Sequence, residues 1–131
     1  MTGLVVVAHA GLAAELINAA EMIVGKIEGS AAVGINPEDS VDQIRTALTA
    51  AIESVSSENI IIMTDMFGGT PSNMSLSFLK ENRIEVLTGV NLPMLIKFAS
   101  DRSRLGVAEL ASQIRDTGRE GVTVAGDYLK K

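Results

Sequence analysis

Uninterrupted apolar runs alternate along the chain with segments in which apolar residues recur at every third or fourth position. The apolar runs at residues 4–7 and within 59–64 are typical of strands that are buried on both faces, as in a parallel sheet. Weaker strand patterns follow at residues 27–35, 84–87 and 121–124. The chain is therefore expected to contain several strands that are separated by helices.

Helical spacing and capping signals place the segments between these strands. Ser40 with Gln43 three residues later is a capping box, which marks a helix start. Thr70 before Pro71 predicts an N-cap followed by proline at the first helical position. Gly118 predicts the end of the last helix. We expect helices from Leu12 to near Gly25, from Ser40 to Val55, from Thr70 to about Lys80, from about Leu92, and over residues 105–115.

The resulting order, β-α-β-α-β-α-β-α-α-β, predicts one α/β domain over residues 1–131. Such alternation implies a three-layer, doubly wound and mainly parallel sheet with right-handed crossovers and helices on both faces. The strand order 2-1-3-4, which is typical of flavodoxin-like proteins, places the topological switch point between the first and third strands. Under that order, which the sequence alone does not prove, the loops after these two strands border one crevice.

The composition narrows the classes of partner. Acidic residues outnumber basic ones by 16 to 11, the net charge is -5 and no Lys/Arg cluster occurs, so we expect neither nucleic acid nor an anionic membrane as a partner. The chain has no cysteine, which excludes disulfides and thiol chemistry and fits a cytoplasmic protein. No segment is apolar over the roughly 18 residues of a membrane span, so we expect no membrane insertion.

His9 is the only histidine, and it lies where the first buried strand gives way to a helix. Ligands and reactive groups collect at such strand ends in doubly wound folds. The first helical turn, near Ala10 and Gly11, favours negative charge and so suits a phosphate group. A hydrogen-bonded structural histidine is the alternative interpretation.

Asp65 ends the strand at residues 59–64 and precedes a glycine-rich loop. A histidine nucleophile needs one ring nitrogen unprotonated, and a carboxylate that accepts the proton of the other nitrogen fixes that tautomer. Asp65 is the candidate for this role. Gly68 and Gly69 allow backbone amides to approach a phosphoryl group, and Thr70 can add an amide and a hydroxyl. The alternative interpretation is a turn aspartate before a plain strand-to-helix connection.

Two other protein classes that share this fold fit the residues less well. Receiver domains carry an aspartate after the third strand and a hydroxyl after the fourth, positions that Asp65 and Thr88 could fill. They also need acidic residues after the first strand to hold Mg²⁺, and Ala8, His9 and Ala10 stand there. A flavodoxin needs a hydroxyl-rich phosphate loop at the same place. We therefore expect neither a metal site nor a cofactor.

A specific combination of motifs runs through the chain. Asp-x-x-Gly-Gly-Thr-Pro-x-Asn at residues 65–73 is followed by Gly-Val-Asn-Leu-Pro-Met at residues 89–94. With Val-Val-Val-Ala-His at residues 5–9, Ala-Glu-Met at 20–22 and Thr-Gly-Arg-Glu-Gly at 117–121, the chain resembles the EIIA component of the mannose family of the bacterial sugar phosphotransferase system. The segments occur in the family's order and span nearly the whole chain.

The resemblance implies that His9 accepts a phosphoryl group from the phosphocarrier protein HPr and passes it to an EIIB domain for sugar uptake with phosphorylation. It also implies that Asp65 hydrogen-bonds the histidine and that the loop of residues 68–70 lines the phosphate. Family members form homodimers in which the last strand, here about residues 122–124, crosses to the partner as an antiparallel edge strand.

The chain departs from the family at two points. Family members usually have glycine directly after the histidine, whereas Ala10 precedes Gly11 here, and its methyl group could narrow the approach of a partner's histidine. Many relatives continue into an EIIB domain, whereas we expect a single EIIA domain over residues 1–131, with EIIB acting in trans.

Some interpretations stay open at this point. A stand-alone regulatory module, whose phosphorylation state is sensed by a binding partner, is the alternative to a transport component. The phosphoryl-donor subunit of dihydroxyacetone kinase shares the histidine strand but should carry appended carrier domains. Met66 and Phe67 form either a docking surface for HPr or a loop packed on the core, and Arg102 is expected on a solvated face.

Overall fold

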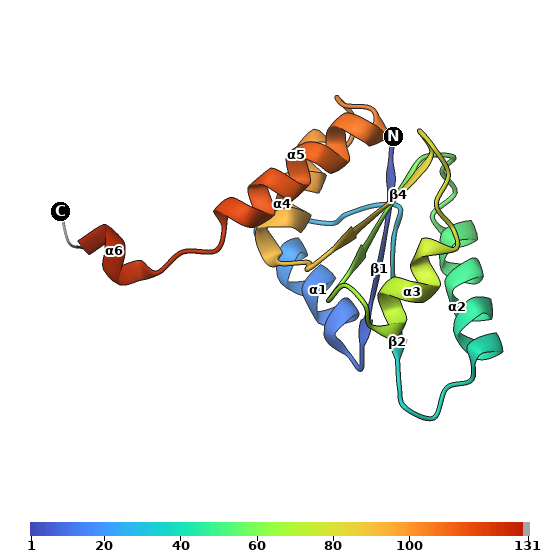
Figure 1. Ribbon diagram of the computed structural model, residues 1–131. Helices are drawn as coiled ribbons and strands as arrows, with labels where there is room; N and C mark the ends of the chain where they lie inside the picture. The colour runs from blue at the N-terminus through green and yellow to red at the C-terminus, as the bar shows by residue number, and fades with distance from the viewer. Residues whose placement is uncertain (130–131) are drawn as a thin grey trace.

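The computed structural model describes residues 1–129, which contain a four-stranded sheet with helices on both of its faces (Figure 1). The strands are paired in parallel in the order β2-β1-β3-β4. Their bounds are β1 (Gly3–His9), β2 (Ser30–Ile35), β3 (Ile60–Thr64) and β4 (Ile84–Thr88). The expected α/β class, the doubly wound layering and the strand order are confirmed.

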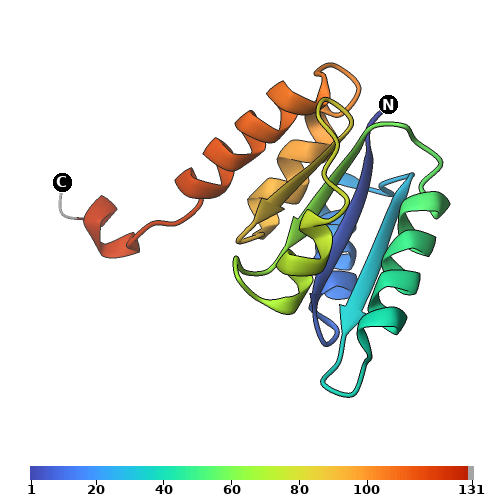
Figure 2. The ribbon, with the colours of Figure 1, turned by 45° about the vertical axis from the view of Figure 1, so that its right-hand side comes forward.

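The helices form two layers around this sheet. Figures 1 and 2 show α1 (Leu12–Val24), α4 (Leu92–Asp101) and α5 (Val107–Glu120) over one face. The other face is covered by α2 (Val41–Ser54) and α3 (Thr70–Leu76). The short helix α6 (Ala125–Leu129) ends a segment that extends away from the body of the molecule in both views.

The two central strands, β1 and β3, are buried on both faces. Leu4 and Val6 of β1 pack in the apolar cluster under α1, α4 and α5, whereas Val5 and Val7 pack in the cluster under α2 and α3. These four side chains, like those of residues 60–63, are at most 1% exposed. Burial of a large apolar side chain contributes about 1.5–3 kcal/mol. These two strands therefore form the centre of the core.

The expected capping box at the start of α2 is confirmed. Ser40 Oγ accepts a hydrogen bond from the Gln43 N–H at 3.1 Å, and Gln43 Oε1 accepts one from the Ser40 N–H at 2.7 Å. The expected start of α3 was wrong by one residue, because Gly69 is the N-cap and Thr70 is already helical. Proline has no N–H and is tolerated throughout the first helical turn. Pro71 is therefore compatible both with a helix that begins at Thr70 and with one that begins at Pro71.

The ends of two helices differ from the expectation. α3 ends at Leu76 rather than near Lys80, and α5 continues through Gly118 to Glu120. A Cβ at position 118 would lie 2.7 Å from the Cγ and Sδ atoms of Met94. Gly118 therefore marks a close contact between α5 and α4, not the end of a helix.

Residues 121–124, expected as a last strand, are not in a strand in the single chain that the structure describes. Val122 and Val124 are 76% and 69% exposed, and Leu129 of α6 is 85% exposed. A strand that pairs with a second copy would not form within one chain, so the antiparallel edge strand stays a prediction.

Arg102, expected on a solvated face, is buried and holds the amino end of β1. Its Nε and Nη2 atoms donate hydrogen bonds to the carbonyl oxygen of Thr2 at 3.0 Å and 2.7 Å. The guanidinium group also lies 4.9 Å from the centre of the Phe98 ring, which is within the range of a cation–π contact. These contacts tie the end of α4 to the strand that carries His9.

Replacement of Ser40 by alanine tests the capping box. Ser40→Ala removes the hydroxyl that accepts the Gln43 N–H, and we expect the free energy of unfolding to fall by about 1 kcal/mol. Urea denaturation followed by circular dichroism measures this change. The exposed Ser103, whose alanine variant should match the wild type, is the control. Equal stability of the Ser40→Ala and Ser103→Ala variants would contradict the assignment.

Candidate functional site

His9 and Asp65 meet where the two central strands end. His9 is the last residue of β1, and Asp65 directly follows β3, its parallel neighbour. The carboxyl ends of adjacent parallel strands lie at the same edge of a sheet, and β1 and β3 run side by side (Figure 1). His9 and Asp65 therefore lie at one edge of the sheet. The His9 side chain is 51% exposed and that of Asp65 only 14%. The structure therefore leaves the ring open to a partner and encloses the carboxylate.

One carboxylate oxygen holds both the backbone and the ring of His9. Oδ2 of Asp65 accepts the His9 backbone N–H at 3.0 Å and lies 2.7 Å from the ring Nδ1. The other oxygen, Oδ1, accepts the Met66 N–H at 3.0 Å. Since a carboxylate oxygen accepts, Nδ1 carries the proton and Nε2 is unprotonated in the neutral ring. Within residues 1–129, Nε2 makes no hydrogen bond.

Two opposing effects determine the pKa of the Asp65 carboxyl group. Its burial raises the pKa of the carboxyl group, but the hydrogen bonds from the backbone and ring of His9, together with the attraction of the ring charge, lower it. The net result is a pKa for Asp65 below the ordinary value of 3.8. The group is therefore ionised at neutral pH and stabilises positive charge on the imidazole.

The loop after Asp65 reaches the His9 ring. Gly68 has φ +86°, a left-handed conformation that glycine adopts without strain. Gly69 lies so close to the ring that an added Cβ would be 3.3 Å from His9 Cε1. The first hydrogen bond of α3 runs from the Asn73 N–H to the Gly69 carbonyl. The amides of Gly69 and Thr70 thus precede the helical hydrogen-bond ladder and stay open to a ligand.

In the turn after His9, the backbone amide of Ala10 does not face an open site as expected. Ala10 has φ +52°, and its N–H donates to the Ile35 carbonyl at 2.9 Å. This amide, expected as a phosphate contact, is therefore already engaged. Gly11 is the N-cap of α1, and its surroundings are open.

The surface beside the His9 ring is hollowed, and apolar side chains are exposed in the loop that follows Asp65. A hollow of about 320 Å³ opens beside the ring and is lined by Ala10, Ile35, Asn36, Pro37, Asp39, Ile44 and Thr70. Met66 and Phe67 are 55% and 74% exposed, so the alternative of a loop packed on the core is wrong. Leu12, the first residue of α1, is 46% exposed. The buried residues of α1 are Ala13, Ile17 and Ala20, a stripe with helical spacing.

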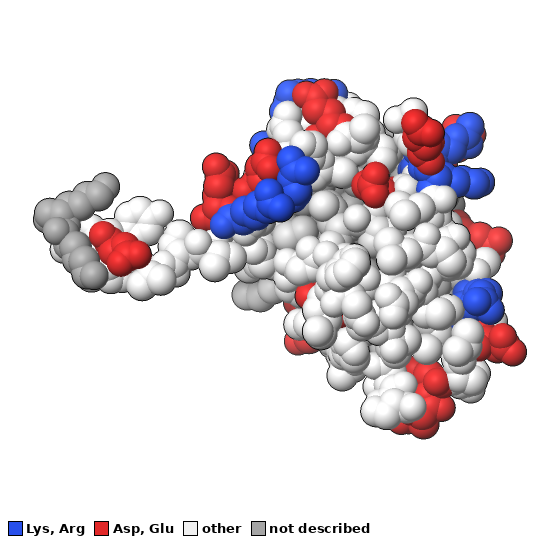
Figure 3. Space-filling model, in the orientation of Figure 1, with Lys and Arg blue, Asp and Glu red and all other residues white. Residues whose placement is uncertain are grey.

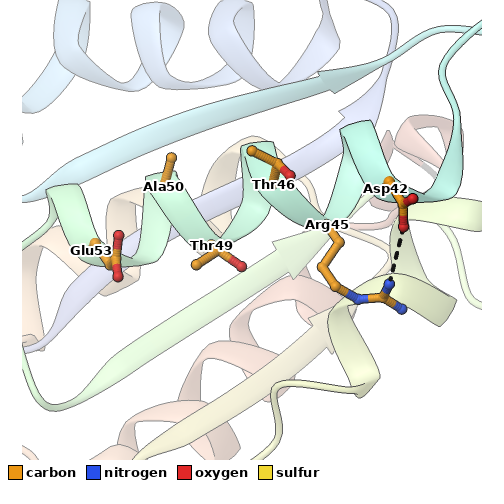
Figure 4. Close-up of a pocket in the computed structure, with 6 residues that line it drawn as sticks. All are labelled: Asp42, Arg45, Thr46, Thr49, Ala50 and Glu53. Carbon is orange, nitrogen blue, oxygen red and sulfur yellow. Dashed lines mark ion pairs between the residues drawn. The ribbon is translucent and has the colours of Figure 1, made fainter.

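A shallow hollow away from His9 lies on the outer side of α2 (Figure 4). It is lined by Asp42, Arg45, Thr46, Thr49, Ala50 and Glu53, which point outward from one helix, and Arg45 and Asp42 form an ion pair at 3.8 Å. A single exposed helix face with one weak ion pair is an ordinary solvated surface. None of the candidate site residues lines it.

Charge and metal chemistry add no second site to the described chain. On the face shown in Figure 3, basic and acidic side chains are interspersed without a large patch of one sign. Residues 1–129 contain no group of three or more acidic or histidine side chains placed to hold a metal ion. None of the helices in this range is long and apolar enough to cross a membrane.

Comparison with known proteins gives a consistent set of relatives. Residues 3–115 match the family model EIIA-man, described as "PTS system fructose IIA component". The sorbose-specific EIIA component of Lacticaseibacillus casei is 30% identical, over 96% of this chain and 92% of that protein. The mannose-specific EIIAB component of Escherichia coli is also 30% identical, over 93% of this chain but 39% of that protein. Component EIIA from Streptococcus agalactiae, 26% identical, superposes with a TM-score of 0.88 over 97% of this chain and 99% of that one.

The pKa of Asp65 predicts a contribution to stability that depends on pH. Because its pKa is lower in the folded than in the unfolded chain, the contribution is present above the ordinary value of 3.8 and is lost as the pH falls through the folded value. We expect the free energy of unfolding to fall more between about pH 5 and about pH 3 in the wild type than in Asp65→Asn. Urea denaturation at each pH measures this difference.

Glu81→Gln is the matched control, because Glu81 is an exposed carboxylate outside the site. Its stability profile should follow that of the wild type. A parallel decline of the wild type and Asp65→Asn below about pH 4 would contradict the role given to the His9 hydrogen bonds.

Proposed function

The chain belongs to the EIIA-man family of the sugar phosphotransferase system, and on that premise we propose that His9 carries the phosphoryl group. The family gives the chain a role in phosphoryl transfer during sugar uptake. The observation that carries the assignment to His9 is the 2.7 Å contact between its Nδ1 and Asp65 Oδ2, because it directs the other ring nitrogen outward as a nucleophile.

The proposed transfer uses both nitrogens of the ring. The lone pair of Nε2 attacks the phosphorus atom of a donor phosphohistidine, and the bond between phosphorus and the donor nitrogen breaks with its electron pair left on the donor. The proton on Nδ1 stays in place, held by Asp65. The carboxylate stabilises the positive charge that the ring gains as the new bond forms. Transfer to the acceptor is the same step with His9 as the leaving group.

We assign the phosphate contacts to the loop of residues 68–70 and to Gly11. Gly69 and Thr70 offer amides that precede the α3 hydrogen-bond ladder, next to the His9 ring. Gly68 allows the loop to turn toward the ring through its positive φ. Gly11 begins α1, and the first turn of that helix favours negative charge.

The donor in this proposal is HPr, and the acceptor is an EIIB domain. Leu12 follows His9 closely in sequence, and Met66 and Phe67 follow Asp65. Their side chains are exposed and would give a protein donor an apolar surface. The Escherichia coli relative is named an EIIAB component, which supports an EIIB domain as the acceptor. The sorbose and mannose named in the relatives indicate the class of sugar. The absence of cysteine fits action in the cytoplasm.

A homodimer is part of the same proposal. β4 is an edge strand, and a groove beside it is lined by Leu87, Thr88, Arg115, Arg119 and Val122, among others. Val122 and Val124 are exposed in a segment that leaves the body of the molecule (Figures 1 and 2). An unpaired strand edge and exposed β-branched residues are what an intermolecular strand pairing uses. We propose that residues 122–124 pair with β4 of a second copy.

The phosphoryl transfer is tested by incubation with phosphoenolpyruvate, enzyme EI and HPr. We expect acid-labile phosphate on the wild type, none on His9→Ala, and a rate about a hundredfold lower on Asp65→Ala because the tautomer and the ring charge lose their support. Thr49→Ala, on the outer face of α2, is the control for handling and folding. A folded wild type that takes up no phosphate would contradict the proposal. Phosphorylation without onward transfer to any EIIB would favour the regulatory module.

The homodimer is tested by light scattering after size-exclusion chromatography. The wild type should have the mass of two chains, and Val124→Asp should have the mass of one because it places a charge in the paired segment. Val41→Asp makes the same change at a side chain of similar exposure, 57%, on α2 and should stay dimeric. A dimeric Val124→Asp variant would refute pairing through this segment.

A further inference from the structure

Gly34 lies on β2 directly beside the turn that follows His9. In the parallel pairing of β1 and β2, Gly34 is opposite Ala8, and Ile35 is opposite His9. A Cβ built on Gly34 would overlap the carbonyl oxygen of Ala10. The bare Cα of Gly34 thus leaves the space in which the Ala10 carbonyl lies.

This contact differs from those of the other glycines in the described chain. Added Cβ atoms at Gly3 and Gly118 would meet the side chains of Val55 and Met94. At Gly34 the obstacle is a backbone atom, which cannot rotate away as a side chain can. At Gly106, by comparison, an added Cβ would meet nothing within 4 Å. Gly34 has no positive φ, so its requirement for glycine comes from space alone.

The backbone N–H and the backbone carbonyl of Ala10 both lie against β2. The Ala10 N–H donates to the Ile35 carbonyl at 2.9 Å, and the Ala10 carbonyl lies against Gly34. Ala10 has φ +52°, a left-handed conformation that is strained for a residue with a Cβ. Such a conformation persists where the surroundings impose it, and β2 supplies these surroundings.

The Ala10 turn in turn fixes the direction of the His9 side chain. The backbone N–H of His9 donates to Asp65 Oδ2, and the N–H of Ala10, in the next peptide group, donates to the Ile35 carbonyl. Both peptide groups that flank this Cα are therefore anchored, one to β3 and one to β2. The Ala10 carbonyl belongs to the next peptide group, between Ala10 and Gly11, and it is joined to the anchored group through the Ala10 Cα. A shift of this carbonyl would strain that Cα and, through it, would move the ring relative to Asp65 and to the loop at Gly69.

We propose that Gly34 is a positioning residue for His9, which acts by leaving room for the Ala10 carbonyl on β2. The inference rests on the proposed role of His9 and adds a residue from a strand that touches neither the phosphoryl group nor Asp65. Any side chain at position 34 would displace the turn and aim the nucleophilic nitrogen away from the line of transfer. A misplacement of about 1 Å can lower the rate of an oriented reaction by about a hundredfold.

The test is Gly34→Ala with Gly106→Ala as the matched control, since both add one methyl group. Rapid-quench kinetics with phospho-HPr give the limiting rate and the half-saturation concentration. We expect Gly34→Ala to lower the limiting rate about tenfold to a hundredfold and to leave half-saturation unchanged, because the exposed docking surface is intact. The ¹⁵N chemical shifts of the His9 ring nitrogens should change in Gly34→Ala and remain at the wild-type values in Gly106→Ala.

A second variant separates positioning from stability. In Ala10→Gly/Gly34→Ala, a glycine at position 10 lets the carbonyl turn aside, so part of the lost rate and of the ring shift should return. Wild-type ring shifts and rate in a folded Gly34→Ala would overturn the proposal, and so would unfolding of both variants. If the wild type takes up no phosphate, the proposed function fails, yet the ring shifts still decide whether Gly34 positions His9.

Discussion

The burial of β1 and β3 on both faces is the constraint on which the rest of the molecule depends. Apolar side chains fill both sides of these strands, so polar groups can emerge only at their ends. The parallel pairing aligns Val7 with Thr64, which places His9 and Asp65 just beyond the last paired residues. The core therefore decides which residues come together at this edge, and the chemistry of the site follows from their identity.

The site combines a rigid support with an exposed reactive group. Asp65 uses one oxygen for two hydrogen bonds from His9, so the backbone and the ring are held by the same atom. A hydrogen bond to a charged group contributes about 1.5–3 kcal/mol, which is no more than a single buried apolar side chain contributes. The three hydrogen bonds of Asp65 are thus comparable to only a few of the many buried apolar side chains, and the pair depends on the sheet that those side chains hold together. The His9 ring, although half exposed, keeps its orientation because Asp65 is held in place by this sheet.

Sequence patterns predicted the parts of this structure that depend on local or periodic signals. The capping box follows from the spacing of Ser40 and Gln43, and the buried strands follow from their apolar runs. The strand order rests on the analogy with flavodoxin-like proteins, and the meeting of His9 with Asp65 follows from that order. The errors arose where tertiary contacts overrule local propensity. Gly118 looked like a helix end, yet it lies within α5 because Met94 packs against it. Arg102 looked like a surface residue, yet it binds the carbonyl of Thr2, which is distant in sequence.

The turn between β1 and α1 illustrates a constraint that no pattern in the sequence reveals. Glycine would adopt the positive φ of position 10 without strain, but it also has more conformations to lose on folding. Alanine is strained there by about 1–2 kcal/mol, and its narrower range of conformations leaves less freedom for the peptide group next to His9. β2 can hold the strained residue only because Gly34 has no side chain. The glycine that the turn requires is therefore on the neighbouring strand, where only the three-dimensional structure shows its connection to the histidine.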